Sequence, residues 1–446
     1  MSPGSEENES TASGPSTSTR SSRRSSRLSK ISSGTGSPPS DGNLFEHDDA
    51  AQKSPQSSRE TSPEVFAGTP FTTATLGGFP AFQFATYRKN PKSYPKVYHS
   101  SDLQTSLHDQ MNSLRGPIAA HPDLRDVYEA TILQNTADDE PNAPPIAIRN
   151  DIDDEPTPPW NFYYTNKMWH GEGVPDPDIK NLKGCECKGK CNSKSKKCAC
   201  AVKNQQVQDG APNGYDPNGM LLSAGPVFEC NSMCGCDEDC YNRVVQQGRK
   251  YDIAIQKTRH KGWGIFNGKT HIPKFRFIGI YSGEILTDKE AHKRGLYYNA
   301  AGITYLFDID FYWVKERRKP HESVYVVDAF HAGNFTRFLN HSCDPNCRLY
   351  PIFTNEGSDQ KPLLAVFSIK DIQPREEICF NYQGNYPGDE DDGLENPAEE
   401  EEKEKNNADD VIYKKCQCGA ANCTGTISFD LSRLSITERL FRCQDL

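Results

Sequence analysis

The fold of this chain is decided by a cysteine-rich stretch, CECKGKCNSKSKKCAC (residues 185–200), which is followed after a spacer by CNSMCGCDEDC (residues 230–240). All 16 cysteines of the 446 residues lie after residue 184. The first 30 residues lack the apolar stretch of a secretory signal, so we expect an intracellular protein. In a reducing compartment, cysteines crowded in this way favour metal ligation over disulfides.

The two segments together hold nine thiols, an odd number for tetrahedral zinc. Three zinc ions need twelve thiolate positions, which nine thiols supply if three of them each bridge two metals. Two separate four-cysteine sites, or a set of disulfides, would each leave one thiol over. The count favours a cluster of three zinc ions held by Cys185, Cys187, Cys191, Cys198, Cys200, Cys230, Cys234, Cys236 and Cys240.

A second zinc site is predicted near the end of the sequence. Cys416, Cys418 and Cys423 supply three thiols, one short of a closed structural site. Cys343, in the segment Asn340-His341-Ser342-Cys343, is the best candidate for the fourth ligand. It would pin the C-terminal segment over that motif. The remaining cysteines are interpreted as ordinary core or surface thiols.

Composition divides the chain into parts that fold and parts that do not. Hydrophobic residues make up 35%, mean hydropathy is -0.77, and no run of about 18 apolar residues suggests a membrane span. We expect a disordered tail over 1–86 and a poorly defined region over 87–143, with one short helix near 101–114 capped by Ser101 or Asp102. Residues 389–410 predict a solvated acidic insertion, within a segment spanning 384–412.

Charge restricts the partners. The net charge of -10 argues against a general binder of nucleic-acid phosphates and favours a basic partner. The tail nevertheless carries a basic run among serines. That run could be a nuclear import signal, a nucleic-acid contact, a phosphorylated patch or simply solvated charge; its members are Arg20, Arg23, Arg24, Arg27 and Lys30.

After Pro144 the pattern is mostly β. Short runs rich in Ile, Val, Phe and Tyr, bounded by turn residues, predict strands near 252–257, 275–286, 304–310, 324–329 and 363–369. Thr287 and Glu290 match a capping box, which predicts a helix starting at Thr287. A second helix is expected over about 332–339.

Several motifs in fixed order then resemble the suppressor-of-variegation 3-9 family of SET methyltransferases. The resemblance runs from about Ile146 to Phe429, and no single piece of it is specific. Its pieces are residues 150–155 (NDIDDE), 229–231 (ECN), 242–246 (NRVVQ), 261–264 (KGWG), 281–284 (YSGE), 304–307 (TYLF), 337–343 (RFLNHSC) and 380–382 (FNY).

The resemblance implies a SET fold of small curved sheets with a knot-like crossing, in which the chain near 380 passes under the segment near 340. It implies a pre-SET region with a trinuclear zinc cluster over 144–248 and a SET catalytic domain over 249–383. A post-SET zinc region over 413–430 would be completed by Cys343, and a C-terminal tail would follow over 431–446.

The resemblance also implies transfer of methyl groups from S-adenosylmethionine to lysine 9 of histone H3. Such a transfer is an in-line displacement, so the enzyme must align the donor carbon with a neutral amine at roughly 3 Å. Desolvation in an aromatic channel, together with the nearby sulfonium charge, would lower the pKa of the lysine. By resemblance Tyr382 is the catalytic tyrosine and Tyr281 hydrogen-bonds the amine.

Phe380, by resemblance, leaves room for three methyl groups, so trimethylation is expected. Asn381 stands where the family usually has Asp, and this departure could alter the rate or the pH profile. The cofactor pocket is expected at Lys261, Gly262, Trp263, Tyr305, Arg337, Asn340 and His341, with Gln417 closing over it. His341 could instead be a zinc ligand, but four thiols already close the nearby site. Phe429 is a looser candidate for an aromatic lid.

The histone H3 tail is expected to bind extended along a sheet edge. Asp308 and Asp310 could read a basic residue beside the target lysine, or be solvated strand ends. Nucleosomes and chromatin-recruiting proteins in the nucleus, centromeric or other heterochromatin included, are the expected partners, with no membrane and no specific DNA sequence. Three other readings remain: a non-catalytic chromatin scaffold, a methyltransferase for another lysine or a non-histone protein, and a zinc-finger DNA binder, for which basic helices are lacking.

Overall fold

The computed structural model describes residues 75–76, 79–80, 96–113, 124–300, 305–309, 324–382 and 411–430. The predicted tail lies almost wholly outside these ranges, apart from a short pairing of β1 (Thr75–Leu76) with β2 (Phe79–Pro80). The basic run at 20–30, the acidic segment 389–410 and the C-terminal tail also lie outside them. None of the described helices is long and apolar enough to cross a membrane.

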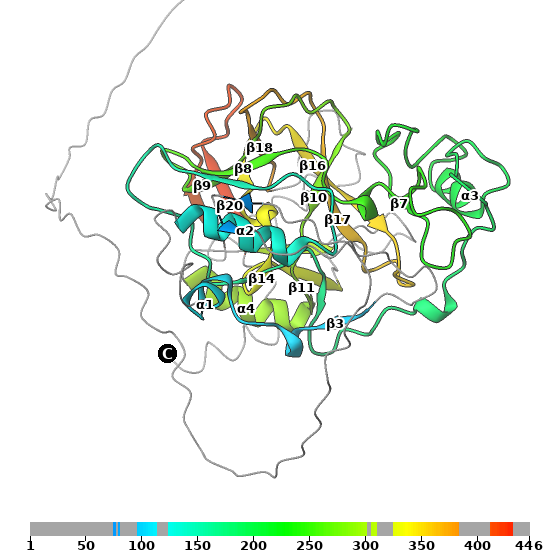
Figure 1. The fold of residues 1–446 in the computed structure, drawn as a ribbon, viewed down its shortest axis with the longest axis horizontal. Helices are drawn as coiled ribbons and strands as arrows, with labels where there is room; N and C mark the ends of the chain where they lie inside the picture. The colour runs from blue at the N-terminus through cyan, green and yellow to red at the C-terminus, as the bar shows by residue number, and fades with distance from the viewer. Residues whose placement is uncertain are drawn as a thin grey trace, which may run out of the picture. The chain divides into compact units, whose positions relative to one another are not determined.

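Small sheets build the folded part, and this confirms the predicted fold class (Figure 1). One sheet has the order β10-β17-β16-β7, a second β12-β13-β11-β6-β3 and a third β15-β18-β9-β8-β4. Their strands are β3 (Tyr98–His99), β4 (Ala147–Arg149), β6 (Trp169–His170), β7 (Val227–Phe228), β8 (Ile253–Lys257), β9 (Trp263–Asn267), β10 (Phe277–Ile280), β11 (Glu284–Thr287), β12 (Leu306–Ile309), β13 (Tyr325–Asp328), β15 (Asn340–His341), β16 (Cys347–Phe353), β17 (Leu363–Ser368) and β18 (Glu377–Phe380). Each strand run predicted from the sequence contains at least one of these strands.

Two further two-stranded pairs complete the β-structure. β5 (Tyr163–Tyr164) pairs in parallel with β14 (Ala332–Gly333), and β19 (Val411–Lys415) pairs antiparallel with β20 (Thr426–Asp430). Helical elements are few: α1 (Leu107–Ser113), α2 (Leu124–Thr136), α3 (Ala199–Gln206), α4 (Asp288–Ala300) and the 3-10 turns η1 (Ser100–Asp102), η2 (Ile179–Asn181), η3 (Val245–Gln247) and η5 (Phe335–Phe338).

The helix predictions fare unevenly. α4 starts as expected, because the Thr287 hydroxyl accepts a hydrogen bond from the Glu290 amide. The helix expected near 101–114 is shorter: α1 begins at Leu107, and Ser106 rather than Ser101 or Asp102 caps it by accepting from the Asp109 amide. The helix expected over 332–339 is wrong. Residues 332–333 pair as strand β14 and only the turn η5 follows, with Asn334 accepting from the Thr336 amide.

Helix α2 was missed, and it forms part of the main core. Its buried face carries Val127, Tyr128 and Ile132, and Tyr128 stacks on Trp160 with ring centroids 5.3 Å apart. Trp160 in turn meets Phe338 of η5 edge-on at 5.7 Å. The region before the cysteines therefore supports the segment that carries the RFLNHSC motif.

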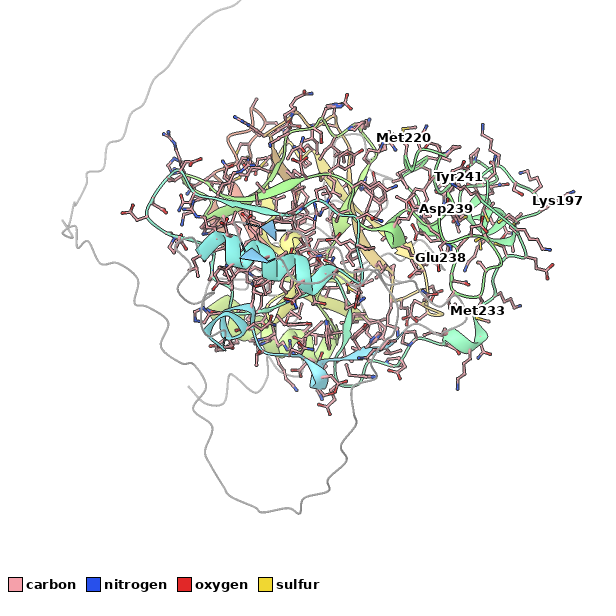
Figure 2. The ribbon with its side chains drawn as sticks, in the orientation of Figure 1. Lys197, Met220, Met233, Glu238, Asp239 and Tyr241 are labelled. Carbon is pink, nitrogen blue, oxygen red and sulfur yellow. The ribbon has the colours of Figure 1, made fainter. Side chains whose placement is uncertain are left out.

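The cysteine-rich region around α3 joins the sheets at β7, beside which it lies in Figure 1. β7 runs parallel to β16, and the Glu229 amide donates to the Phe353 carbonyl at 2.8 Å. The buried Glu229 carboxylate accepts from the Val245 amide at 2.7 Å. Glu238, Asp239 and Tyr241 belong to this region and lie closer to the sheets than Lys197 does in this view (Figure 2).

A buried ionic network ties α4 to the second sheet. The Arg294 guanidinium donates to Glu284 at 2.7 Å and to Asp328 at 2.8 Å, and the side chains of both acids are at most 3% exposed. Tyr298 also donates to Asp328 at 2.8 Å. Removing the cation would leave two carboxylates buried without their ion pair.

We predict that Arg294→Ala lowers the free energy of unfolding by about 3 to 5 kcal/mol, because the buried carboxylates lose their partner. Chemical denaturation monitored by fluorescence measures this. Lys293→Ala is the matched control: its pair with Glu290 is exposed, and its loss should cost at most about 0.5 kcal/mol. Equal losses of unfolding free energy in the two variants would mean that the Arg294 network stabilises the fold no more than an exposed ion pair does.

Candidate functional site

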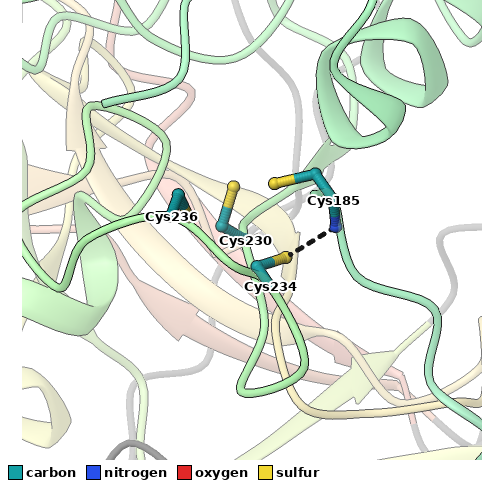
Figure 3. Close-up of side chains that lie close together, drawn as sticks. All are labelled: Cys185, Cys230, Cys234 and Cys236. Carbon is teal, nitrogen blue, oxygen red and sulfur yellow. Dashed lines mark hydrogen bonds between the residues drawn. The ribbon is translucent and has the colours of Figure 1, made fainter. Parts of the chain in front are cut away.

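The structure gathers the cysteines of residues 185–240 into one buried cluster. Three groups of four thiols have all their sulfurs within 4.8 Å of one another: Cys185, Cys230, Cys234 and Cys236; Cys185, Cys187, Cys191 and Cys198; and Cys191, Cys230, Cys236 and Cys240. Figure 3 shows the first group, with the Cys185 amide donating to the Cys234 sulfur at 3.3 Å. Every cysteine in the described ranges is a free thiol.

Sulfur spacing in the cluster fits zinc. Tetrahedral zinc with Zn–S bonds of about 2.3 Å places its sulfurs about 3.8 Å apart. The Cys185 and Cys191 sulfurs are 3.6 Å apart, and those of Cys191 and Cys230 are 3.8 Å apart. Disulfide sulfurs would lie near 2 Å, so the spacing of these thiols is compatible with zinc and too long for disulfides.

A second four-thiol group lies where the C-terminal segment meets the RFLNHSC motif. Cys343 joins Cys416, Cys418 and Cys423, and the Cys343 and Cys416 sulfurs are 3.9 Å apart. The Asn422 amide also donates to the Cys343 carbonyl at 3.0 Å. The structure thus brings together the four ligands predicted for the post-SET zinc.

The predicted crossing is made by strands β15 and β18, which pair in parallel with Asn340 opposite Cys379 and His341 opposite Phe380. The Ser342 amide donates to the Phe380 carbonyl at 3.0 Å. Just beyond β18, the Tyr382 amide donates to His341 Nδ1 at 3.2 Å. Two motifs that are about 40 residues apart in sequence therefore share one location.

Four aromatic rings line up beside this crossing. The ring centroids of Tyr281 and Phe307 are 5.7 Å apart, those of Phe307 and Phe380 are 6.2 Å apart, and those of Phe380 and Tyr382 are 4.9 Å apart. The two tyrosine hydroxyls point to backbone carbonyls: Tyr382 donates to Leu339 at 2.7 Å and Tyr281 to Tyr305 at 3.1 Å. The rings form an apolar wall that carries two fixed hydroxyls.

Both hydroxyls are held in their neutral form. Burial raises the pKa of Tyr281 and of Tyr382 above the usual range, and charge repulsion from Tyr382 raises the pKa of Tyr281 further. Although 39% of Tyr382 is exposed, its hydroxyl is bonded inward to Leu339. At neutral pH each hydroxyl stays protonated and donates to its carbonyl, and its oxygen lone pairs can accept a hydrogen bond from a nearby amine.

Two of the residues predicted for the cofactor pocket, Lys261 and Asn340, contact a carboxylate that the sequence analysis missed, Glu377. Its oxygens accept from Lys261 Nζ at 2.5 Å and from Asn340 Nδ2 at 2.9 Å. Asn340 Nδ2 also lies 3.3 Å from the Trp263 carbonyl. Gly262 between them has φ +70°, with open space where a Cβ would point. A carboxylate that orients both side chains is a positioning group.

Arg337 and Tyr305 form the other part of the predicted pocket. The Arg337 guanidinium lies between aromatic faces, 4.1 Å from the Tyr305 ring centroid and 4.0 Å from that of Phe162. Its Nε donates to the Ala329 carbonyl at 3.0 Å, and burial lowers its pKa. Cation–π contacts in a desolvated setting hold this side chain without a carboxylate.

His341 has both ring nitrogens engaged. Nδ1 accepts from the Tyr382 amide, so Nε2 carries the proton and faces the Cys343 sulfur at 3.3 Å. The histidine therefore bridges the crossing and the four-thiol group while four sulfurs supply the tetrahedral ligand set.

The remaining predicted residues are placed as follows. Gln417 is exposed between Cys416 and Cys418, and Asn381 is buried. Asp308 lies in β12, the edge strand of its sheet, whereas Asp310 is outside the described residues. Phe429 lies in β20 opposite Ile412, with its side chain outside the description.

Sequence reasoning missed Glu377 and Phe307. Phe307 was quoted within the TYLF motif but given no role, and alternation along a strand could have flagged it as sharing a face with Tyr305. Glu377 follows another glutamate, Glu376, and no local pattern separates the two. Only the pairing of β15 with β18 shows which of them reaches the pocket.

Comparison with known proteins identifies the two halves of this arrangement. A SET domain model matches residues 262–383, and a pre-SET motif model matches residues 138–243. The chain is 36% identical over 291 residues to a protein of Schizosaccharomyces pombe named histone-lysine N-methyltransferase, H3 lysine-9 specific, covering 64% of the chain and 56% of that relative. It is 34% identical to SUV39H1-A of Danio rerio over 62% of the chain and 64% of the relative.

The chain therefore belongs to the SET-domain proteins that carry a pre-SET motif. Within that class its sequence is similar to those of relatives named Su(var)3-9 and SUV39H1-A. It spans less than two thirds of the length of either relative. Among solved structures, the Neurospora SET domain protein DIM-5, a histone lysine methyltransferase, is 29% identical with a TM-score of 0.48, over 55% of this chain and 97% of that one.

We predict that Cys343→Ala lowers the zinc bound per chain, because it removes one of four ligands from the C-terminal site. Mass spectrometry under native conditions and a zinc-release assay measure this. Cys347→Ala, four residues away, is the matched control, since Cys347 is buried in β16 away from the four-thiol groups. Unchanged zinc in the Cys343 variant would exclude this site.

Proposed function

We propose that the protein is a histone-lysine N-methyltransferase that transfers methyl groups from S-adenosylmethionine to lysine 9 of histone H3. The aromatic wall beside the strand crossing carries this proposal, because it presents two fixed hydroxyls where an amine would be desolvated. The family membership and the names of the relatives support it. Proteins of this activity act on chromatin, so we place the protein in the nucleus, in heterochromatin.

The residues of the chain divide the chemistry among them. S-adenosylmethionine, when bound, supplies an electrophilic methyl group. Phe307 and Phe380 exclude water from the incoming lysine, which lowers its pKa and releases its proton to solvent. The hydroxyls of Tyr281 and Tyr382 orient the neutral amine. Lys261, Asn340 and Glu377 form the polar end of the pocket that would hold the cofactor.

The space beside Phe380 sets how many methyl groups the product lysine carries. Its ring contacts both Phe307 and Tyr382, and it has no hydroxyl that could hold a water or restrain the amine. An amine that already carries methyl groups must rotate to present its lone pair again. We propose that Phe380 allows this rotation and that the product is trimethyllysine.

The nine thiols would hold three zinc ions. Four of them, Cys185, Cys191, Cys230 and Cys236, each belong to two of the four-thiol groups. Cys200, whose sulfur lies 3.6 Å from that of Cys234, supplies the ninth thiol. Three bridging thiols and six terminal ones would then fill the twelve positions that three zinc ions need. A fourth zinc would occupy the site at Cys343.

The deciding experiment incubates zinc-replete protein with S-adenosylmethionine and an H3 tail peptide and follows product mass. Wild type should add three methyls at lysine 9. Tyr382→Phe should slow the reaction by about a hundredfold, on the scale of losing one positioned polar group, and Phe380→Tyr should stop below three methyls. Tyr241→Phe, distant on the cysteine-rich region, is the control. Activity only on another lysine would redirect the substrate, and inactivity of folded protein on every histone would favour a scaffold.

Glu377→Gln should weaken S-adenosylmethionine binding by roughly tenfold, because Lys261 loses its ion pair and Asn340 its charged partner. Isothermal titration calorimetry measures this. Glu376→Gln is the neighbouring control, since Glu376 bonds to Asn346 and the Gln373 amide instead. Equal losses in both variants would mean that Glu377 has no special role in the pocket.

A further inference from the structure

Residues 180–203, the first segment of the cysteine-rich region, carry a local charge opposite to that of the whole chain. Residues 180–203 contain eight lysines and one acid, Glu186, whereas the chain has a net charge of -10. All eight lysines are exposed: Lys180, Lys183, Lys188, Lys190, Lys194, Lys196, Lys197 and Lys203. Eight solvated cations within 24 residues create a positive local field on this segment.

Zinc alone does not explain this excess. Nine thiolates and three zinc ions would leave the cluster with a charge of about -3. Arg243, whose guanidinium lies 3.7 Å from the Cys236 sulfur, already offsets part of it from inside. The seven net positive charges of residues 180–203 exceed the charge of the metal cluster itself, and the six acids of residues 204–243 offset part of them.

Neighbouring acids neutralise one side of the region but not the other. Lys190 Nζ lies 2.6 Å from Asp239, and Asp237 donates its amide to the Gly189 carbonyl, which sets the acidic turn 237–239 against Lys188 and Lys190. At the other end, the turn before α3 holds Lys194, Lys196 and Lys197. Among the described residues, no ion pair is found for these three.

Hydrogen bonds within this turn hold its backbone, so that its lysines keep a defined arrangement. Ser195 Oγ accepts from the amides of Lys197 and Cys198, and Asn192 Oδ1 accepts from that of Lys194. Lys196 Nζ donates to Gln205 of α3 at 2.7 Å, a neutral partner that keeps the charge. Lys197 extends outward at the outer end of the region, away from the sheets (Figure 2).

We propose that the basic turn Lys194–Lys197 binds the phosphate backbone of duplex DNA, and so docks the enzyme on the nucleosome whose tail it modifies. Lysines bind phosphates as point charges and read no base sequence. Both cysteine flanks of the turn are cluster residues, Cys191 and Cys198, so its position is tied to the metal core. The docking role rests on the proposed function, whereas the DNA contact does not.

The test measures binding of full-length, zinc-loaded protein to a 5′-labelled duplex of about 30 base pairs by fluorescence anisotropy across a salt series. The triple variant Lys194→Gln/Lys196→Gln/Lys197→Gln should bind at least about tenfold more weakly and lower the slope of log K against log salt by about 2 to 3. Lys269→Gln/Lys274→Gln/Lys289→Gln changes net charge equally at exposed lysines elsewhere and should match wild type.

Two further measurements separate charge from folding. Zinc content should be unchanged in the triple glutamine variant, and the corresponding triple arginine variant should bind DNA like wild type. Loss of DNA binding in the arginine variant, equal losses in the dispersed control, or at least tenfold tighter binding to single-stranded RNA of the same length would overturn the proposal.

Methylation then tests the docking role. The triple glutamine variant should methylate the H3 peptide like wild type and nucleosomes at least about fivefold more slowly at low salt, a difference that salt should erase. Equal rates on nucleosomes would remove the docking role even if DNA binding were reduced. Inactivity of wild type on both substrates would instead count against the proposed function and leave the DNA result standing.

Discussion

The parallel pairing of β15 with β18 is the constraint on which the site depends. Two residues from each strand suffice, since Asn340 meets Cys379 and His341 meets Phe380. The pairing places the Tyr382 amide on His341 and Glu377 beside Asn340. Parallel neighbours require a long connection, and here the intervening residues form the β16–β17 hairpin. A short run of backbone hydrogen bonds thus brings residues that are distant in sequence together in one site.

The four-thiol group at Cys343 extends the same constraint to the end of the described chain. Cys343 follows β15 by two residues and shares a four-thiol group with Cys416, Cys418 and Cys423. His341 contacts the Cys343 sulfur through Nε2. The strand crossing and the C-terminal thiols are therefore mechanically linked, so that ordering of one favours ordering of the other. A metal holding these thiols would add its binding free energy to that of the fold.

Electrostatics differ sharply between the parts of the molecule. The SET portion buries its charges in compensated sets, such as Arg294 with Glu284 and Asp328. The turn before α3 instead leaves its lysines in solvent. An unpaired charge is strongly unfavourable when it is buried, whereas water stabilises it at the surface. The exposed charges can therefore bind partners, whereas the buried charges stabilise the fold through their ion pairs.

Cysteine spacing, the β-rich runs and the ordered motifs were sufficient to predict the fold class, the capped start of α4 and which thiols gather. The cap and the strands depend on residue type at short range, and the thiols follow from the four-ligand requirement of zinc. Composition could not show that α2 and Trp160 support η5, nor that residues 332–339 lack a helix, because tertiary packing overrides weak local propensity there. Glu377 and Phe307 escaped for the same reason. Only strand pairing, which joins residues far apart in sequence, decided which side chains face the site.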